Sequence, residues 1–283
     1  MEADGNRMEG LHRLGFFVLV LLGGLAIFFL GNPYFQLLPT NRNADYNALL
    51  TVFFLAITIF AHRDETKREY GQLAFAFFVA AFANWALGLE LFRFPSQSAD
   101  TPAGYTWDKL SQAIKVIVPS LLLVKLMGFD LGSIYLQRGK VKGWVLVGFG
   151  SFIAWTVLGF VVGAGQGKEL DSMLASLPLW FTFSLLNAFM EELWFRGLFL
   201  KRLTPFLGSG LSVLVLALVF ALAHVGVTYV TPGEILLFVL PTFFIGMGAG
   251  YVMVKTDSVW GAVLFHAGAD VFYALGWTFS SVQ

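Results

Sequence analysis

The 283-residue sequence contains no cysteine, and only 13% of its residues are charged. The absence of cysteine excludes disulfides, cysteine-ligated zinc and cysteine nucleophiles. Eighteen basic residues balance eighteen acidic ones, so the global charge gives no support to nucleic-acid binding. Soluble domains carry about 25% charged residues, and the 57% of hydrophobic residues here exceeds what one water-soluble core can bury. The sequence therefore predicts a protein whose main solvent is lipid.

The hydrophobic residues form nine stretches of about 20 residues, the length that an α-helix needs to cross a bilayer. The fourth stretch contains Lys115 and Lys125, so it also fits a tilted or interfacial helix. The first stretch follows Arg7 and Arg13 but has no small-residue cleavage site after it, which favours an uncleaved anchor over a signal peptide. We expect an all-α, polytopic transmembrane helical bundle of about nine spans, at residues 15–31, 44–61, 71–92, 110–127, 143–162, 177–200, 211–230, 235–254 and 259–279.

The basic residues between these stretches are distributed unequally over the two sides of the membrane. Eleven precede the first span or lie in the even-numbered connections, whereas the odd-numbered connections hold four, namely Arg42, Arg93, Lys109 and Lys168. Loops on the cytoplasmic side carry the excess of Lys and Arg. We therefore expect an integral multi-pass protein of the cell membrane, with its N-terminus in the cytoplasm and its C-terminus outside.

Ionisable side chains within a span cost free energy and need a reason. In the sixth stretch Glu192 and Arg196 are four residues apart, a spacing that predicts an ion pair with a structural role. Glu191 is rotated by about 100° from Glu192, shares a helix face with Asn187, and has no cation nearby in sequence. A carboxylate in that position suits a general base. The alternative is that it reaches water at the cytoplasmic end of the helix.

Histidines follow in the seventh and ninth stretches. A single histidine in a span is often a helix–helix hydrogen-bonding residue, but His224 and His266 together with Glu191 indicate an acid–base centre. Asp270 is four residues after His266, so its carboxylate can orient the imidazole. The helical rise places His224 about 20 Å deep, below the other two, unless the seventh helix starts later or is tilted. Phe220, one turn before His224, is expected to separate that ring from lipid.

Three short motifs carry a family resemblance. The sequence EELWFRG at residues 191–197 resembles the EExxxR motif of the CPBP family, the CAAX proteases and bacteriocin-processing enzymes also called Abi proteins. FALAH at 220–224 is similar to the family's FxxxH motif, and HAGAD at 266–270 resembles its HxxxN or HxxxD motif. The resemblance covers about residues 177–279. It implies a glutamic intramembrane endopeptidase that uses no metal or other cofactor and cleaves a membrane-anchored substrate, whether a prenylated CAAX-type protein or another.

The resemblance also implies a role for each matched residue. Glu191 would be the catalytic base, and His224 would help it to hold and activate the attacking water. His266 would stabilise the oxyanion of the tetrahedral intermediate. Glu192 and Arg196 would give structural support to the site.

Asp270 departs from the prenyl endopeptidases, which have Asn at the end of the third motif. An ionised Asp cannot donate a hydrogen bond to an oxyanion. We expect Asp270 to take part in catalysis by accepting a hydrogen bond from His266, the alternative being a protonated Asp270. This departure weakens a specifically prenyl-dependent assignment.

The chain is thus expected to have two parts. Residues 1–170 would form N-terminal transmembrane helices of unassigned role, and residues 171–283 a CPBP-type catalytic transmembrane core. The expected partners are a membrane-anchored peptide or protein substrate and the lipid bilayer, with no nucleic acid.

Other classes of protein stay open at this point. Glu191, His224 and His266 could in principle hold zinc in a metal-dependent protease, although the sequence has no HExxH. A non-catalytic scaffold or immunity protein of the same fold and a proton-coupled transporter are further alternatives. The GxSG and GxGD motifs of serine and aspartyl intramembrane proteases do not occur. Gly208-Ser209-Gly210 instead predicts a turn, and Gly246 with Gly250 predicts close helix packing.

Overall fold

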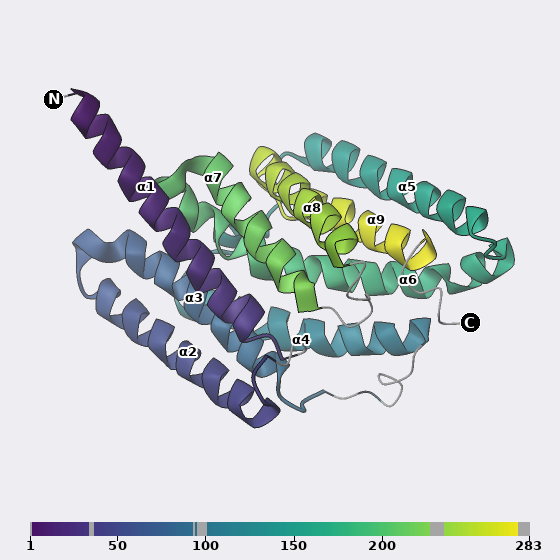
Figure 1. Cartoon of the computed structure of the whole chain (residues 1–283), viewed down its shortest axis with the longest axis horizontal. Coiled ribbons are helices and arrows are strands. Elements are labelled where there is room, and N and C mark those ends of the chain that lie inside the picture. Colours follow the sequence, from purple (N-terminus) through teal and green to yellow (C-terminus); the bar gives the residue numbers. More distant parts are fainter. Residues whose placement is uncertain (1, 34–36, 93, 95–100, 227–234, 277–283) are drawn as a thin grey trace.

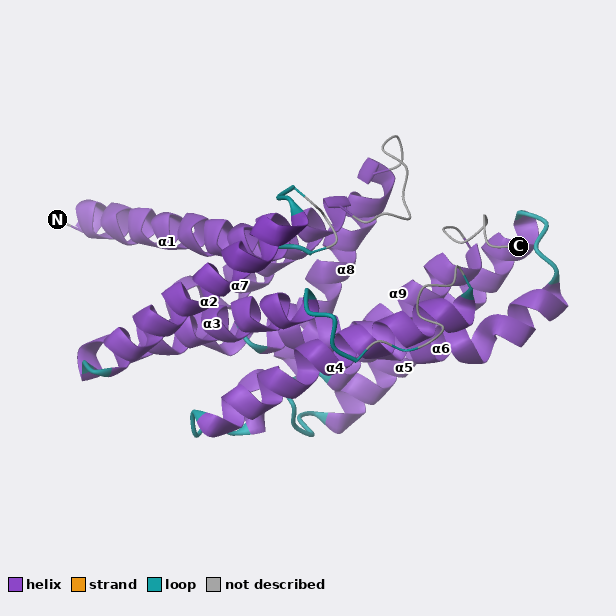
Figure 2. Cartoon of the chain, turned by 90° about the horizontal axis from the view of Figure 1, so that it is seen from below, coloured by secondary structure: helices purple, strands orange, loops and turns teal. Residues whose placement is uncertain are grey.

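The computed structural model describes residues 2–33, 37–92, 94, 101–226 and 235–276, and within them the chain is all-helical, without a strand (Figures 1 and 2). Nine α-helices lie in this described part, one for each stretch expected from the sequence. They are α1 (Glu2–Leu25), α2 (Thr40–His62), α3 (Arg68–Leu87), α4 (Pro102–Leu126), α5 (Val141–Gly165), α6 (Leu170–Glu191), α7 (Leu200–Ala223), α8 (Ile235–Thr256) and α9 (Trp260–Gly276). The expected polytopic helical bundle is thereby confirmed.

Seven of these helices, with the turns that adjoin them, are long and apolar enough to cross a membrane. The two others are α4 and α9. Helix α4 carries charged side chains, among them Asp108, Lys109 and Lys115, and α9 has only 17 residues. Helix α4 packs on α3 and α6, and α9 packs on α5, α6 and α8. Where protein covers these helices, polar groups and a short length are tolerated.

Six helices form a closed ring. Going around it, α3 packs on α4, α4 on α6, α6 on α9, α9 on α8, α8 on α7, and α7 again on α3. The remaining three helices lie outside this ring, with α1 against α7, α2 against α3 and α5 against α9 (Figure 1). The centre of the ring is therefore enclosed by segments from both halves of the chain.

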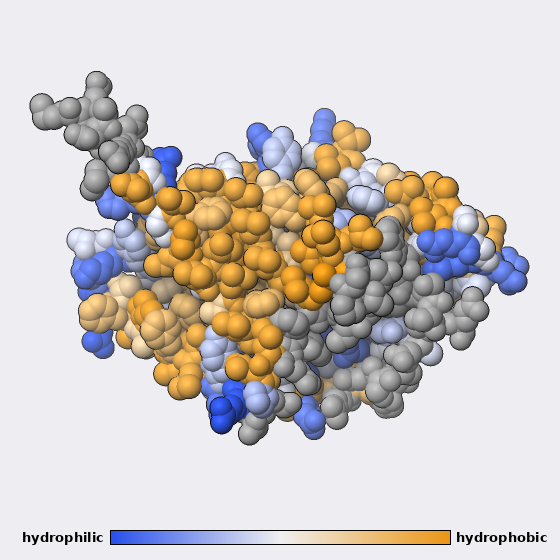
Figure 3. Space-filling model, viewed as in Figure 1, coloured by the Kyte–Doolittle hydropathy of each residue, from blue (hydrophilic) through white to orange (hydrophobic). Residues whose placement is uncertain are grey.

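Outer helices and part of the ring carry the apolar surface that lipid would cover. Only 11% of the apolar window of α5 is buried inside the protein, against 78% for α3. Figure 3 shows a continuous hydrophobic area over α1, α7 and α8. Because an apolar surface of this extent is unfavourable in water, we expect this face of the bundle to meet the bilayer.

Three asparagines fasten α1 to its neighbours. Helix α1 continues as a π-helical segment (Ala26–Leu30) and ends at Gly31, whose carbonyl oxygen accepts hydrogen bonds from Asn43, Asn47 and Asn84 at 3.3, 2.7 and 2.8 Å. Carbonyls at a helix end lack intrahelical partners and must be satisfied inside a membrane protein. These bonds fix the end of α1 against α2 and α3.

The seventh helix begins at Leu200, earlier than the sequence suggested, and is interrupted at Gly208. The φ of Gly208 is 72°, a conformation that favours glycine, so the predicted turn occurs as a break within α7. Helix α8 packs closely on α7, as the glycine pair predicted. A Cβ atom at Gly246 would lie 3.2 Å from Ala217, and one at Gly250 would lie 2.9 Å from Val213.

Candidate active site

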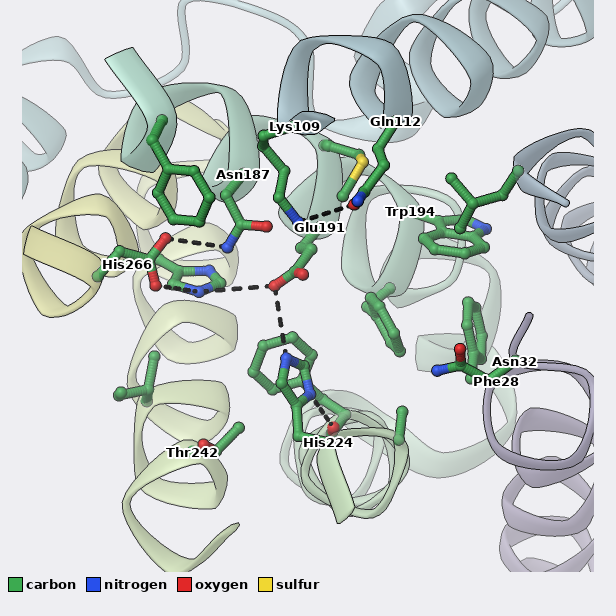
Figure 4. Close-up of a pocket in the computed structure, with 18 of the residues that line it drawn as sticks. Phe28, Asn32, Lys109, Gln112, Asn187, Glu191, Trp194, His224, Thr242 and His266 are labelled. Atoms are coloured by element: carbon green, nitrogen blue, oxygen red, sulfur yellow. Dashed lines mark hydrogen bonds and ion pairs between the residues drawn. The ribbon is translucent and has the colours of Figure 1, made fainter. Parts of the chain in front are cut away.

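A cavity of about 270 Å³ lies at the centre of the ring. All six ring helices line it, and the end of α1 contributes Phe28 and Asn32 (Figure 4). Apolar side chains form much of the wall. The charged and amide side chains come mainly from α4 on one side and from α6, α7 and α9 on the other, namely Asp108, Lys109, Gln112, Asn187, Glu191, His224, His266 and Asp270.

Glu191 lies at the end of α6 with its carboxylate between two imidazoles (Figure 4). Its Oε2 atom is 3.8 Å from Nε2 of His224 and 3.7 Å from Nε2 of His266. Both separations exceed a direct hydrogen bond, and Oε2 is buried without a hydrogen-bond partner among the described residues. The three side chains that the motifs singled out, far apart in the sequence, thus converge on one point of the cavity.

His224 directly follows α7 and is held by its own helix. Its Nδ1 lies 2.7 Å from the carbonyl oxygen of Phe220, a contact in which the ring nitrogen must be the donor. In the neutral imidazole this tautomer leaves Nε2 as an acceptor facing Glu191. The ring of Phe220 is buried against both imidazoles, with centroids 4.4 Å from His224 and 5.6 Å from His266. The depth difference expected for His224 does not separate it from Glu191, because α7 runs obliquely to α6 (Figure 1).

Glu192 connects Arg196 to His266. Its Oε1 atom accepts from Nη1 of Arg196 at 2.6 Å and lies 2.8 Å from Nδ1 of His266. The expected ion pair is therefore present, and both partners are almost fully buried, at 0% and 1% exposure. Arg196 also donates to the carbonyl oxygen of Gly246 at 3.2 Å, and its guanidinium lies 4.4 Å over the ring of Phe220. The motif residues 192–197 form a π-helical segment, a conformation found frequently at functional sites.

The carboxylate bonded to His266 is that of Glu192, whereas the sequence had suggested Asp270. Oδ1 of Asp270 lies 3.5 Å from Nε2 of His266, and Oδ2 accepts a hydrogen bond from Nδ2 of Asn187 at 2.9 Å. The four-residue spacing within α9 identifies Asp270 as a neighbour of His266, but it cannot identify neighbours on other helices. The packing of α6 against α9 adds Glu192 on one side of the imidazole and Asn187 beside Asp270.

The site lies within a segment that matches a known protein family. Residues 173–272 match the family model of type II CAAX prenyl endopeptidase Rce1-like proteins. This segment, called the CAAX protease segment below, is therefore similar to the CAAX proteases of the CPBP family. No curated protein and no solved structure matches the chain. The CAAX protease segment extends from α6 into α9 and contains all three motifs. At the level of the family, this similarity supports a CAAX-type membrane peptidase.

Helices that precede the CAAX protease segment also line its cavity, which the sequence did not reveal. On α4, Nζ of Lys109 donates to Gln112 at 2.8 Å, and Gln112 in turn donates to Asp108 at 2.6 Å. In the π-helical segment after α1, Phe28 stacks on Phe195 with ring centroids 4.1 Å apart. The sequence signals for this helix are the charges of Lys115 and Lys125 within the fourth stretch and of Lys109 in the connection before it.

Within the residues described, no three His, Asp or Glu side chains are grouped so that they could ligate one ion.

Proposed function

We propose that the protein is an intramembrane endopeptidase that hydrolyses a peptide bond in a membrane-anchored substrate, with Glu191 and His224 activating the water. The observation that carries this proposal is the position of Glu191 Oε2, 3.8 Å from Nε2 of His224 and 3.7 Å from Nε2 of His266 at the cavity wall. Polar atoms separated by such distances are suited to sharing a bridging water. A water bound by Glu191 and His224 would have a base and a second acceptor at once.

The reaction would follow from these contacts. Glu191 takes a proton from the water while the water oxygen forms a bond to the carbonyl carbon of the substrate. The π electrons of the carbonyl move to its oxygen, and the Nε2–H of His266 donates a hydrogen bond to that oxyanion. The C–N bond then breaks, and Glu191 returns its proton to the departing amine. The products are a carboxylate and an amine, without an acyl-enzyme.

Glu192 and Arg196 would support this chemistry indirectly. The hydrogen bond between Glu192 and Nδ1 of His266 fixes the orientation of the imidazole and favours its protonated form. The Nε2–H of His266 then points into the cavity, where the oxyanion would form. Arg196 balances the charge of Glu192, which is buried completely.

The cavity limits the kind of substrate. At about 270 Å³ it is smaller than most ligand pockets, which enclose about 300–1,000 Å³. It would therefore accept a short extended segment and no folded domain. We propose a membrane-anchored peptide or protein as the substrate, with a prenylated CAAX-type protein as one member of that class.

Cleavage of membrane-tethered peptides in proteoliposomes tests the proposal. Prenylated and unprenylated peptides are offered to the wild type, Glu191→Gln and His224→Ala, each with and without a chelator. We expect both variants to lose about 100-fold or more of the rate, as is usual when a general base is removed, and the chelator to have no effect. Glu169→Gln, the same chemical change at an exposed position just before α6, is the matched control and should cleave like the wild type.

Each of the other outcomes would indicate a different mechanism or function. If Glu191→Gln cleaves as fast as the wild type, Glu191 is not the base. Sensitivity of the wild type to the chelator indicates a metalloprotease. If neither the wild type nor any variant cleaves any peptide, a non-catalytic scaffold becomes the preferred interpretation.

We also propose that the N-terminus lies in the cytoplasm and the C-terminus outside, in the cell membrane. The chain has no cysteine, so a single introduced cysteine can be labelled without background. Glu65→Cys, before α3, should react with an impermeant maleimide from the cytoplasmic side, and Gln166→Cys, after α5, from the outside. The reverse pattern would contradict the orientation.

A further inference from the structure

An amide and a carboxylate meet beside the proposed base. Asn187 lies on α6 one turn before Glu191, and its Nδ2 donates to Oδ2 of Asp270 on α9 at 2.9 Å (Figure 4). Asn187 is only 8% exposed, and its Oδ1 is buried without a hydrogen-bond partner among the described residues. A buried polar atom without a partner costs free energy, so the amide is held in an orientation that favours its donor group.

The second oxygen of Asp270 lies within ion-pair distance of His266 but makes no hydrogen bond to it. Oδ1 is 3.5 Å from Nε2 of His266, whereas a charge-assisted N–H···O bond has a length of about 2.7–2.9 Å. The other ring nitrogen of His266 is already bound to Glu192 at 2.8 Å. The carboxylate of Asp270 is therefore close enough to attract the positive charge of the imidazolium, but it does not accept a hydrogen bond from Nε2–H.

This separation matters for an oxyanion donor. If Asp270 moved closer by about 0.7 Å, it would accept the Nε2–H directly, and His266 could no longer donate to the developing oxyanion. If Asp270 were absent, the imidazolium would lose a nearby negative charge. The observed position combines electrostatic support with a free donor, and the hydrogen bond from Asn187 holds the carboxylate from its other oxygen.

We propose that Asn187 is a positioning residue, which acts by restraining Asp270 just outside hydrogen-bond distance of His266 so that the imidazole donates to the oxyanion. This inference rests on the proposed function. It also explains how the site accommodates an aspartate at the end of its third motif: the amide is supplied by α6. In this arrangement the effect of Asn187 reaches the reaction through Asp270 and His266.

A purely structural role for Asn187 is the competing explanation, because an interhelical hydrogen bond stabilises a membrane bundle by itself. The two roles differ in how the catalytic effect of removing Asn187 depends on the residue at position 270. If Asn187 restrains the carboxylate, its removal has little effect on catalysis once residue 270 is an amide. If it only joins two helices, the loss on its removal is similar in both backgrounds.

A double-mutant cycle separates these roles. The kcat and KM of the wild type, Asn187→Ala, Asp270→Asn and the double variant are measured with the cleaved peptide in proteoliposomes. We expect Asn187→Ala to lower kcat about tenfold in the wild-type background, with KM nearly unchanged, and less than about twofold in the Asp270→Asn background. Ser184→Ala is the control on the same helix: it removes a buried hydroxyl that has no hydrogen-bond partner among the described residues, and it should leave kcat unchanged. Equal losses in both backgrounds, or a change confined to KM, would overturn the proposal.

Nitrogen NMR of the histidines tests the same idea without any cleavage. The chain has only four histidines, so the Nε2 signal of His266 can be assigned through its disappearance in His266→Gln. We expect this signal to shift in Asn187→Ala and to stay in place in Ser184→Ala. An unchanged signal in Asn187→Ala refutes the positioning role, whether or not a substrate is found. A shifted signal in a protein that cleaves nothing supports the positioning of His266 and rejects the proposed hydrolysis.

Discussion

Replacement of Glu192 by glutamine should destabilise the protein strongly, because one carboxylate oxygen serves two cationic partners. Oε1 of Glu192 is 2.6 Å from Arg196 and 2.8 Å from His266, and Glu192 and Arg196 are 0% and 1% exposed. Removal of one partner of a buried ion pair costs about 3–5 kcal/mol, since the other charge stays buried without compensation. Glutamine keeps the size of the side chain and one acceptor oxygen, so we expect about 3 kcal/mol, at the lower end of that range.

The loss can be measured by equilibrium unfolding in mixed micelles, with the double variant Glu192→Gln/Arg196→Met as the control. The double variant removes both charges, and uncharged replacements of buried ion pairs are often neutral in stability. It should therefore recover most of the loss. Its cleavage rate should stay reduced by at least about tenfold, because His266 has lost the carboxylate that orients it. If Glu192→Gln is as stable as the wild type, or if the double variant is less stable than Glu192→Gln, the compensation described here is wrong.

Two further substitutions test the packing around the site. Gly246→Ala would place a Cβ atom 2.9 Å from Nη2 of Arg196, so we expect a loss of about 1–3 kcal/mol in unfolding free energy and slower cleavage. The control Gly150→Ala, with no atom within 4 Å of its Cβ, should leave both unchanged. Equal effects of the two substitutions would contradict the close contact at Gly246. Asn84→Leu removes two hydrogen bonds to carbonyl oxygens at the end of α1, including that of Gly31 at 2.8 Å. We expect it to lower the unfolding free energy by about 1–3 kcal/mol. An unfolding free energy within about 0.5 kcal/mol of the wild type would show that these bonds do not fasten α1.

The helices could be predicted from the sequence because a membrane span is encoded locally. About 20 apolar residues in a row leave the backbone no alternative to a helix in lipid, and each of the nine stretches corresponds to one helix in the described residues. The ends were less predictable. The seventh helix starts at Leu200, because its first turn includes Lys201 and Arg202 and is partly buried. Hydropathy alone does not mark such a turn as part of a span, and helix ends are difficult to place.

The candidate site was predictable only in part. The spacing of Glu192 and Arg196 predicted their ion pair, because residues four apart lie side by side on any α-helix. The same rule led to Asp270 as the hydrogen-bond partner of His266, and there it was insufficient. The partner is Glu192, 74 positions away in the sequence, and no spacing within one helix could have shown it.

The sequence by itself determined the apolar composition, the number of helices in the described residues and the ionisable residues that the second half contributes to the cavity. These properties depend on residue type and on separations of a few positions. Only the tertiary structure decided that helices from both halves enclose one cavity, that Glu191 faces two imidazoles, and that Asn187 holds Asp270. Such contacts join residues on different helices, and their distances follow from how the side chains of the whole bundle pack together.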